Sequence, residues 1–395
     1  MVELINHGVY LLNGNEIRDN YQGMTPDEAR ENTITYGILR SHDVDGGKGN
    51  KMRIRFDAMM SHDITYVGII QTARASGLEE FPLPYAMTNC HNSLCAVGGT
   101  INEDDHVFGL SAAKKYGGIY VPANQAVIHQ YAREMMVKCG NMILGSDSHT
   151  RYGSLGNMGV GEGGGELVKH LLKNTWDINA PEVVLVWLEG APKKGIGPHD
   201  VAISLVKATF ESGVVKNKVL EFAGPGVKNL PIDFRNGIDI MTTETTCLSS
   251  IWVTDEEVKH HYDIHERPQD YRELKPGDVA YYDMMIRIDL STQESMIALP
   301  FHPSNAVTIH ELQADPVGIL TRIEEDAKKR FGDKVDVHLV DKVVDGKVQA
   351  DQGIIAGCSG GTYDNLAEAA AILKGKNIGN DYFTASAYPQ STPVS

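Results

Sequence analysis

The segment 141–150 constrains the fold most, because an apolar run there leads directly into a polar turn. Met142 to Leu144 predicts a buried strand, and the residues that follow bring an acid, a hydroxyl and an imidazole to its end. The stretch 153–166 is rich in glycine, and a helical pattern begins at Leu167. Asp and Ser also cap helices and fill turns. A rigid strand end followed by such a loop is nevertheless a common way to build an active site.

Length and charge limit the classes of function. With 395 residues the chain is long enough for two or three domains. A formal net charge of −16 argues against nucleic acid and against a membrane surface as partners. A small anionic substrate would therefore need a local basic pocket. The longest obvious apolar run, Val183 to Leu188, is too short to span a membrane.

The cysteines and the N-terminus predict a cytoplasmic protein. Five cysteines, an odd number, are scattered along the chain, which is typical of a reducing compartment rather than of a disulfide framework. Residues 1–10 lack the basic segment and apolar core of a secretory signal.

Apolar runs alternate with amphipathic patterns, which predicts an α/β fold with mostly parallel strands. We expect one domain over residues 1–181, a second over 182–290 and part of a third over 291–395. The predicted strands are 85–88, 142–144, 183–188, 335–340, 353–356 and 382–388. The predicted helices are 126–138, 167–172, 201–210 with Asp200 as its cap, one following the capping box 254–257, and 365–373.

Three further segments place reactive side chains at strand ends or in turns. Cys90 and His91 follow a predicted strand, and Glu244 lies among threonines. Cys358 falls in a tight turn between a strand and a helix, where a helix N-terminus lowers the pKa of a thiol and favours metal binding or nucleophilic chemistry. Each residue also has an ordinary structural explanation, since cysteines are often buried and a glutamate can simply organise hydrogen bonds.

Two glycine motifs suggest other functions. Residues 159–164 match G-x-G-x-x-G but do not directly follow a strand, which argues against a dinucleotide site. Residues 357–361 match the nucleophile elbow G-x-S-x-G around Ser359. A hydrolase triad of that type needs a histidine after the serine, and none follows His338. The order of residues therefore argues against a serine hydrolase.

Taken together, these segments resemble the aconitase family of iron–sulfur hydro-lyases. Residues 145–150 resemble its Asp-Ser-His loop, and 128–130 resemble the histidine motif that precedes it. Residues 241–250 resemble the segment with its active-site glutamate, and 355–358 resemble the turn with its first cluster cysteine. More weakly, His62-Asp63 and Cys90-His91 occupy the places of a substrate-binding glutamine and an Asp-His pair.

The resemblance implies layered α/β domains around a central cleft, with the C-terminal part of the architecture missing. It implies reversible dehydration and hydration of a hydroxy di- or tricarboxylate, with a [4Fe–4S] cluster as Lewis acid in the full-length parent. It assigns catalytic roles to His91, Asp147, His149 and Glu244, substrate contacts to His62, His129 and Ser148, and a cluster-ligand role to Cys358.

Departures from the family pattern set further expectations. The family completes its cluster with cysteines after the first one, whereas this chain has none after Cys358. Cys90 stands where an aspartate is expected and Ile240 where an asparagine is expected. We therefore expect an N-terminal fragment that holds no intact cluster, turns over no substrate and self-associates through its truncated edge. The alternative is a cluster-free binding or regulatory protein on the same fold.

Overall fold

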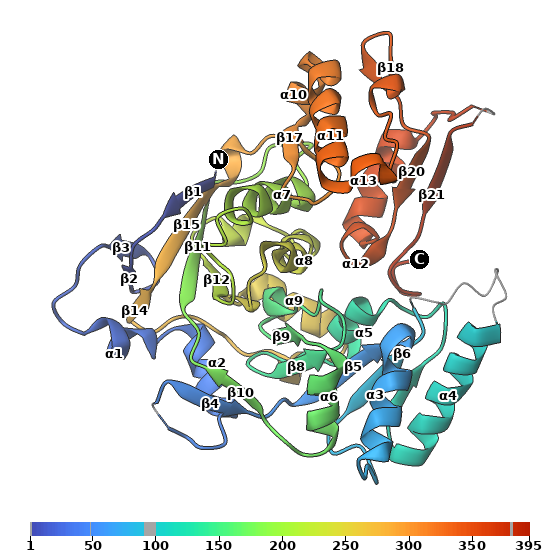
Figure 1. Ribbon diagram of the computed structural model, residues 1–395. Helices are drawn as coiled ribbons and strands as arrows, with labels where there is room; N and C mark the ends of the chain where they lie inside the picture. The colour runs from blue at the N-terminus through green and yellow to red at the C-terminus, as the bar shows by residue number, and fades with distance from the viewer. Residues whose placement is uncertain (1, 48, 91–99, 380–381) are drawn as a thin grey trace.

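Two five-stranded sheets organise the molecule, which is an α/β structure as the sequence predicts (Figure 1). The computed structural model describes residues 2–47, 49–90, 100–379 and 382–395. Both sheets lie in the first three quarters of the chain, and smaller two-stranded sheets follow.

The first sheet is parallel throughout and has the order β7-β6-β5-β8-β9. Its strands are β5 (Ala58–His62), β6 (Tyr85–Thr88), β7 (Ile119–Val121), β8 (Met142–Gly145) and β9 (Met158–Gly161). Its helices are α3 (Asp63–Ala75), α4 (Thr100–Tyr116), α5 (Ile128–Met135) and α6 (Gly164–Leu171). Helix α3 packs between α4 and α6, while α5 packs against β5 (Figure 1). Because helices cover the sheet, β5, β6 and β8 are buried along their whole length.

The second sheet has the order β1-β15-β11-β12-β13, and only β1 runs antiparallel to its neighbour. Its strands are β1 (Val2–Ile5), β11 (Val183–Glu189), β12 (Val219–Ala223), β13 (Ser249–Trp252) and β15 (Met284–Asp289). Helices α7 (Pro198–Thr209) and α8 (Ile232–Met241) pack on each other beside it (Figure 1). The two sheets lie on either side of residue 181 in the sequence, except that β1 joins the second. The domain division at 181 and 290 stays a prediction.

The remaining elements lie around the two sheets or follow them in the chain. Around the two sheets are β2 (Val9–Leu12), β3 (Glu16–Arg18), α1 (Pro26–Arg30), α2 (Ile34–His42), β4 (Lys51–Ile54), β10 (Trp176–Asn179), α9 (Glu256–Ile264) and β14 (Val279–Tyr282). The C-terminal elements are β16 (Met296–Ala298), β17 (Ala306–Thr308), α10 (Ile309–Ala314), α11 (Pro316–Phe331), β18 (Val343–Val344), β19 (Lys347–Val348), β20 (Gln352–Ile355), α12 (Gly357–Gly360), α13 (Tyr363–Leu373) and β21 (Thr384–Ala387).

Three local predictions are wrong. Residues 335–339 form no strand and are mostly exposed, because no neighbouring strand pairs with them. Helix α9 is capped by Asp255, which accepts from the Val258 N–H, so the cap lies one residue later than expected. Asp200 lies inside α7 as its third residue, where its carboxylate accepts from the Gly197 N–H at 2.7 Å.

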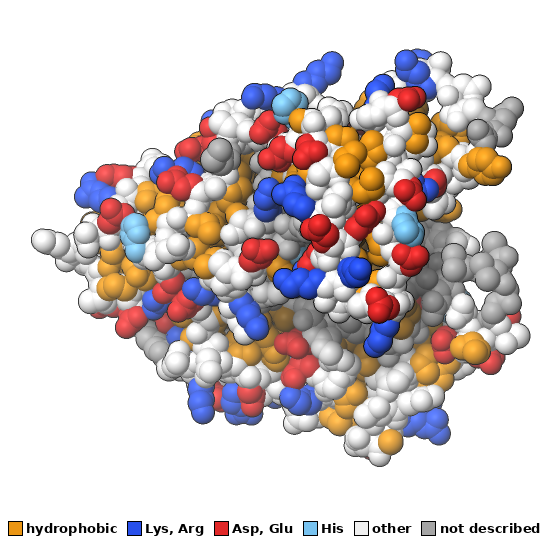
Figure 2. Space-filling model, turned by 45° about the horizontal axis from the view of Figure 1, so that its top comes forward, with side chains coloured by type: hydrophobic (Ala, Val, Ile, Leu, Met, Phe, Trp, Pro, Cys, Tyr) orange, Lys and Arg blue, Asp and Glu red, His pale blue; other side chains and the backbone are white. Residues whose placement is uncertain are grey.

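The sequence predictions about nucleic acid and membranes rest on net charge and on the length of apolar runs, and the structure describes both the surface charge and the helices. On the face shown in Figure 2, acidic and basic side chains alternate rather than gather by sign. Within the described residues, no helix combines the length and the apolar character that crossing a bilayer requires.

Candidate active site

The candidate site lies at the carboxyl ends of two neighbouring parallel strands. β5 ends at His62, and β8 runs into the loop that contains Asp147. The Ser146 N–H donates to the Met60 carbonyl at 3.0 Å, which continues the pairing of the two strands past the end of β8. In parallel sheets such ends meet at one edge, and this is where ligands usually bind.

Asp147 brings three histidines together. Its Oδ1 atom lies 2.9 Å from His129 Nε2 and accepts the backbone N–H of His149 at 2.7 Å. His149 Nδ1 lies 3.6 Å from the same oxygen, and His62 Nε2 lies 3.5 Å from Oδ2. His129 comes from α5 and is buried, and its Nδ1 atom contacts the Tyr152 hydroxyl at 3.1 Å. One carboxylate thus fixes side chains from two strand ends and one helix.

Glu244 contacts the same loop from the segment between α8 and β13 of the second sheet. It lies in a 3-10 turn, Thr242–Thr245, which continues from α8. Its Oε1 atom is 2.9 Å from His149 Nε2, and the Thr243 hydroxyl donates to the Ser148 carbonyl at 2.8 Å. The His149 imidazole therefore lies between two carboxylates. The Ser148 hydroxyl is 3.3 Å from His149 Nδ1.

These contacts give His149 and His129 different protonation states. Asp147 and then Glu244 raise the pKa of His149 to about 9, against the effect of its burial. The hydrogen bond from His149 lowers the pKa of Glu244. Burial lowers the pKa of His129, and its contact with Asp147 only partly opposes this. At neutral pH the site therefore holds an imidazolium at His149 and a neutral imidazole at His129.

Cys358 lies at the start of α12, after a glycine in the left-handed region (φ +81° at Gly357). Burial raises the pKa of its thiol to about 11, although the charge of Arg133 lowers it. The expectation of a lowered pKa is therefore wrong, because α12 is a single turn and desolvation outweighs its effect. The charge of Asp147 also acts on this thiol. Cys358 thus lies within electrostatic reach of the Asp147 loop.

The predicted residues His62, His129, Asp147, Ser148, His149 and Glu244 are connected by direct contacts. His91 lies outside the described residues. Sequence reasoning missed His302, whose Nε2 atom is 3.7 Å from Glu244 Oε2. No motif marks His302, so only the folded structure reveals its position.

The serine of the G-x-S-x-G motif does meet a histidine. His199 from α7 places Nε2 at 3.0 Å from the Ser359 hydroxyl, and burial lowers the pKa of this imidazole. Because His199 lies before Ser359 in the sequence, the order of residues gave no sign of this contact. Within the part of the chain that the structure describes, no carboxylate lies within ion-pair distance of His199, so the acid of a triad is not supplied.

An iron–sulfur cluster is held by several cysteine thiolates, so its ligands must be sought among the thiols of the chain. Cys139 and Cys247 are buried in separate cores and donate to the carbonyls of Leu155 and Thr242. The charge of Cys90 also acts on the Cys358 thiol. Among the residues described, no group of three or more His, Cys, Asp or Glu has the arrangement of a metal site. The described donor set therefore does not fit a [4Fe–4S] cluster.

The fold and the site define an α/β protein with an acid–base centre of imidazoles and carboxylates at parallel strand ends. The model of the aconitase family (aconitate hydratase) matches residues 36–395. The chain belongs to the aconitase family.

Several relatives support this assignment. Mitochondrial aconitate hydratase of Schizosaccharomyces pombe is 26% identical over 387 residues, which cover 92% of this chain and 46% of that protein. The 3-isopropylmalate dehydratase large subunit 2 of Archaeoglobus fulgidus is 28% identical over 277 residues, which cover 70% of this chain and 58% of that protein. The chain thus spans about half the length of the curated relatives it matches. These relatives are hydratases and dehydratases, so the family is one of lyases.

Proposed function

We propose that the whole protein is a hydro-lyase that reversibly removes water from a hydroxy di- or tricarboxylate. The observation that carries this proposal is the His149 imidazolium held between Asp147 and Glu244. Hydroxide is a poor leaving group, so an acid must protonate it as the carbon–oxygen bond breaks. With a pKa of about 9, His149 is protonated at neutral pH and can donate that proton.

The neighbouring residues orient this acid and the substrate. Asp147 fixes the imidazole and stabilises its charge, while Glu244 holds the departing water. His129 is neutral and buried, and it hydrogen-bonds near the substrate together with Ser148 and His62. The relatives' names suggest small carboxylate substrates. We assign no residue of this chain to the base that takes the proton from the adjacent carbon.

No step of this proposal uses an iron–sulfur cluster, because the described thiols do not supply its ligands. We expect the purified chain to contain iron and acid-labile sulfide far below the amount that one cluster per chain requires. A stoichiometric cluster would show that the ligand set is wrongly assigned.

The test is dehydration of a panel of hydroxy di- and tricarboxylates by the full-length protein, followed through the ultraviolet absorbance of the unsaturated product. His149→Asn and Asp147→Asn should each lower kcat by about 10²–10⁴. His42→Asn is the matched control, because it removes an imidazole–carboxylate pair (His42 Nε2 to Asp57 Oδ2, 2.8 Å) outside the site. Equal activity of His149→Asn and His42→Asn would overturn the proposal.

The alternative is a cluster-free binding or regulatory protein, and the substitutions at Cys90 and Ile240 favour it. Calorimetry with the same carboxylates separates the two functions. Binding that Asp147→Asn weakens, without turnover by the full-length protein after anaerobic treatment with iron and sulfide, would support the alternative. Turnover after that treatment would exclude it.

A further inference from the structure

His302 is a second imidazole beside Glu244. It lies in the loop between β16 and β17, far in sequence from the rest of the site. Its Nε2 atom is 3.7 Å from Glu244 Oε2, while His149 contacts the other oxygen, Oε1, at 2.9 Å. The two oxygens of one carboxylate thus each face a different histidine.

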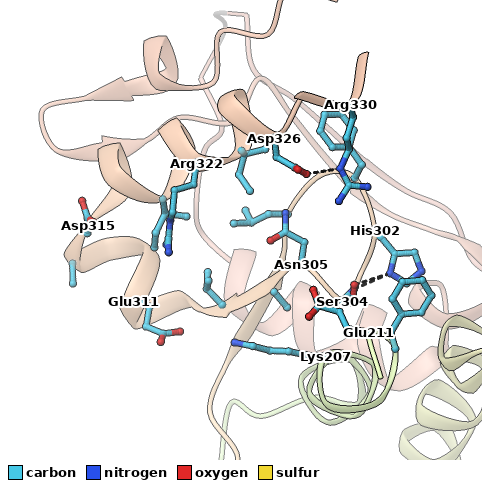
Figure 3. A pocket seen from close by; sticks show the side chains of 18 residues that line it. Lys207, Glu211, His302, Ser304, Asn305, Glu311, Asp315, Arg322, Asp326 and Arg330 are labelled. Carbon is cyan, nitrogen blue, oxygen red and sulfur yellow. Dashed lines mark hydrogen bonds and ion pairs between the residues drawn. The ribbon is translucent and has the colours of Figure 1, made fainter. Parts of the chain in front are cut away.

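The surroundings of His302 determine which nitrogen carries its proton. The backbone N–H of Ser304 donates to Nδ1 at 3.1 Å, and the Ser304 hydroxyl lies 3.0 Å from the same atom (Figure 3). An N–H donor needs the ring lone pair, so Nδ1 of the neutral imidazole carries no proton. The proton is therefore on Nε2, the atom that faces Glu244.

Packing fixes the orientation of this ring. His302 stacks on Phe210, the C-cap residue of α7, with ring centroids 3.7 Å apart and an interplanar angle of 23°. The loop also closes on itself, because the Leu299 N–H donates to the Asn305 carbonyl at 2.7 Å and the Asn305 N–H donates to the His302 carbonyl at 2.9 Å. The imidazole is thus held on one face by an aromatic ring and at one edge by its own loop.

The ring also lines a large cavity, of which Glu244 is not a lining residue. The cavity measures about 950 Å³ and is bounded by the end of α7, the β16–β17 loop and α11 (Figure 3). The side chain of His302 is 32% exposed, and Arg322 and Asn305 line the same cavity without contacting Glu244. A ligand that enters here would meet His302 next to the carboxylate.

We propose that His302 is a positioning residue, whose Nε2–H holds Oε2 of Glu244 so that Oε1 stays directed at His149. At 3.7 Å the contact is longer than a hydrogen bond, and such contacts often tighten when a ligand closes the site. The inference rests on the proposed function only for its catalytic consequence.

The experiment titrates His149 by NMR in protein labelled at its histidine ring carbons. His302→Phe keeps the stack on Phe210 and removes the donor, whereas His302→Gln returns an amide donor. Arg322→Gln is the matched control, because it changes the same cavity wall. We expect His302→Phe to lower the pKa of His149 by about one unit, and the other two variants to leave it near the wild-type value. Circular dichroism verifies that each variant is folded.

Two outcomes would overturn the inference. One is an unchanged titration of His149 in folded His302→Phe, and the other is an equal decrease in His302→Phe and His302→Gln. In the full-length protein, His302→Phe should lower kcat about tenfold with KM unchanged, and His302→Gln should restore most of it. If the wild-type protein turns over none of the carboxylates, the proposed function fails, but the NMR titration still decides the role of His302.

Discussion

β8 and β20 each lead into a turn that carries a residue of the candidate site, but they are held in different ways. β8 is a central strand of a five-stranded sheet and is buried at every residue. β20 pairs only with β21, and its residues alternate between exposed and half-buried. Helix α13, which follows it, buries none of its residues. The Asp147 loop is therefore placed by a hydrophobic core, whereas the turn at Cys358 is placed by a few polar contacts.

The largest difference is expected in the free energy of unfolding. Leu144→Ala on β8 removes a fully buried side chain and should lower this free energy by about 2–5 kcal/mol. The matched change on β20, Ile354→Ala, affects a side chain that is 57% exposed and should cost less than about 0.5 kcal/mol. Urea denaturation monitored by circular dichroism measures both. Equal losses would mean that the two strands are equally buried in solution.

The second difference concerns pH. The folded pKa of His149, about 9, lies above its ordinary value of 6.5. Its contacts therefore contribute stability that is fully present below pH 6.5 and is lost as the pH rises through about 9. The contribution is on the order of 3 kcal/mol. The gap between wild type and His149→Asn in denaturant titrations should close over that range.

A histidine in the C-terminal part supplies the control for this pH effect. His338 pairs with Asp336 at 2.9 Å, but both side chains are largely exposed. Solvent screens such a pair, so His338→Asn should leave the pH dependence of stability unchanged. If His149→Asn and His338→Asn changed the pH dependence of stability equally, the expected difference between the buried site and the exposed C-terminal part would be contradicted.

A smaller effect is expected where the C-terminal segment meets α5. The Ser391 hydroxyl donates to Glu134 Oε1 at 2.6 Å in a buried contact. Ser391→Ala should lower the free energy of unfolding by about 1 kcal/mol and speed amide exchange in α12. Thr392→Ala removes an exposed contact with the Gln125 carbonyl and should change neither quantity. Hydrogen exchange of both variants tests whether this contact orders the Cys358 turn.

The smallest effect is electrostatic. The buried guanidinium of Arg133 lowers the pKa of the Cys358 thiol, which burial raises to about 11. At a fixed pH below 11, Arg133→Met should therefore slow alkylation of Cys358, by less than about tenfold. Arg133→Lys keeps the positive charge and should leave the alkylation rate unchanged. Mass spectrometry of iodoacetamide-treated protein measures the rate. Faster alkylation in Arg133→Met would show that the charge acts in the opposite direction.

Elements with strong local signals could be predicted from the sequence. The strand before Asp147 and the helix of His129 are found where the apolar patterns placed them, because burial on a sheet or helix face leaves a periodic record. The strand predicted at 335–340 is wrong, because a strand also needs a partner that no local pattern supplies. The helix caps predicted at Asp200 and Thr254 lie at other residues in the structure, because several neighbouring acids and hydroxyls compete for the same N–H groups.

The sequence by itself determined the α/β class, the family and the loop in which Asp147, Ser148 and His149 follow a buried strand. These properties depend on apolar periodicity and short motifs, which are local. Only the tertiary structure decided that Glu244 meets His149, that His302 faces the same carboxylate and that His199 reaches Ser359. It also decided that the pKa of Cys358 is raised. Such contacts join residues that lie far apart in the sequence, and they depend on strand order and desolvation, which exist only after the chain has packed.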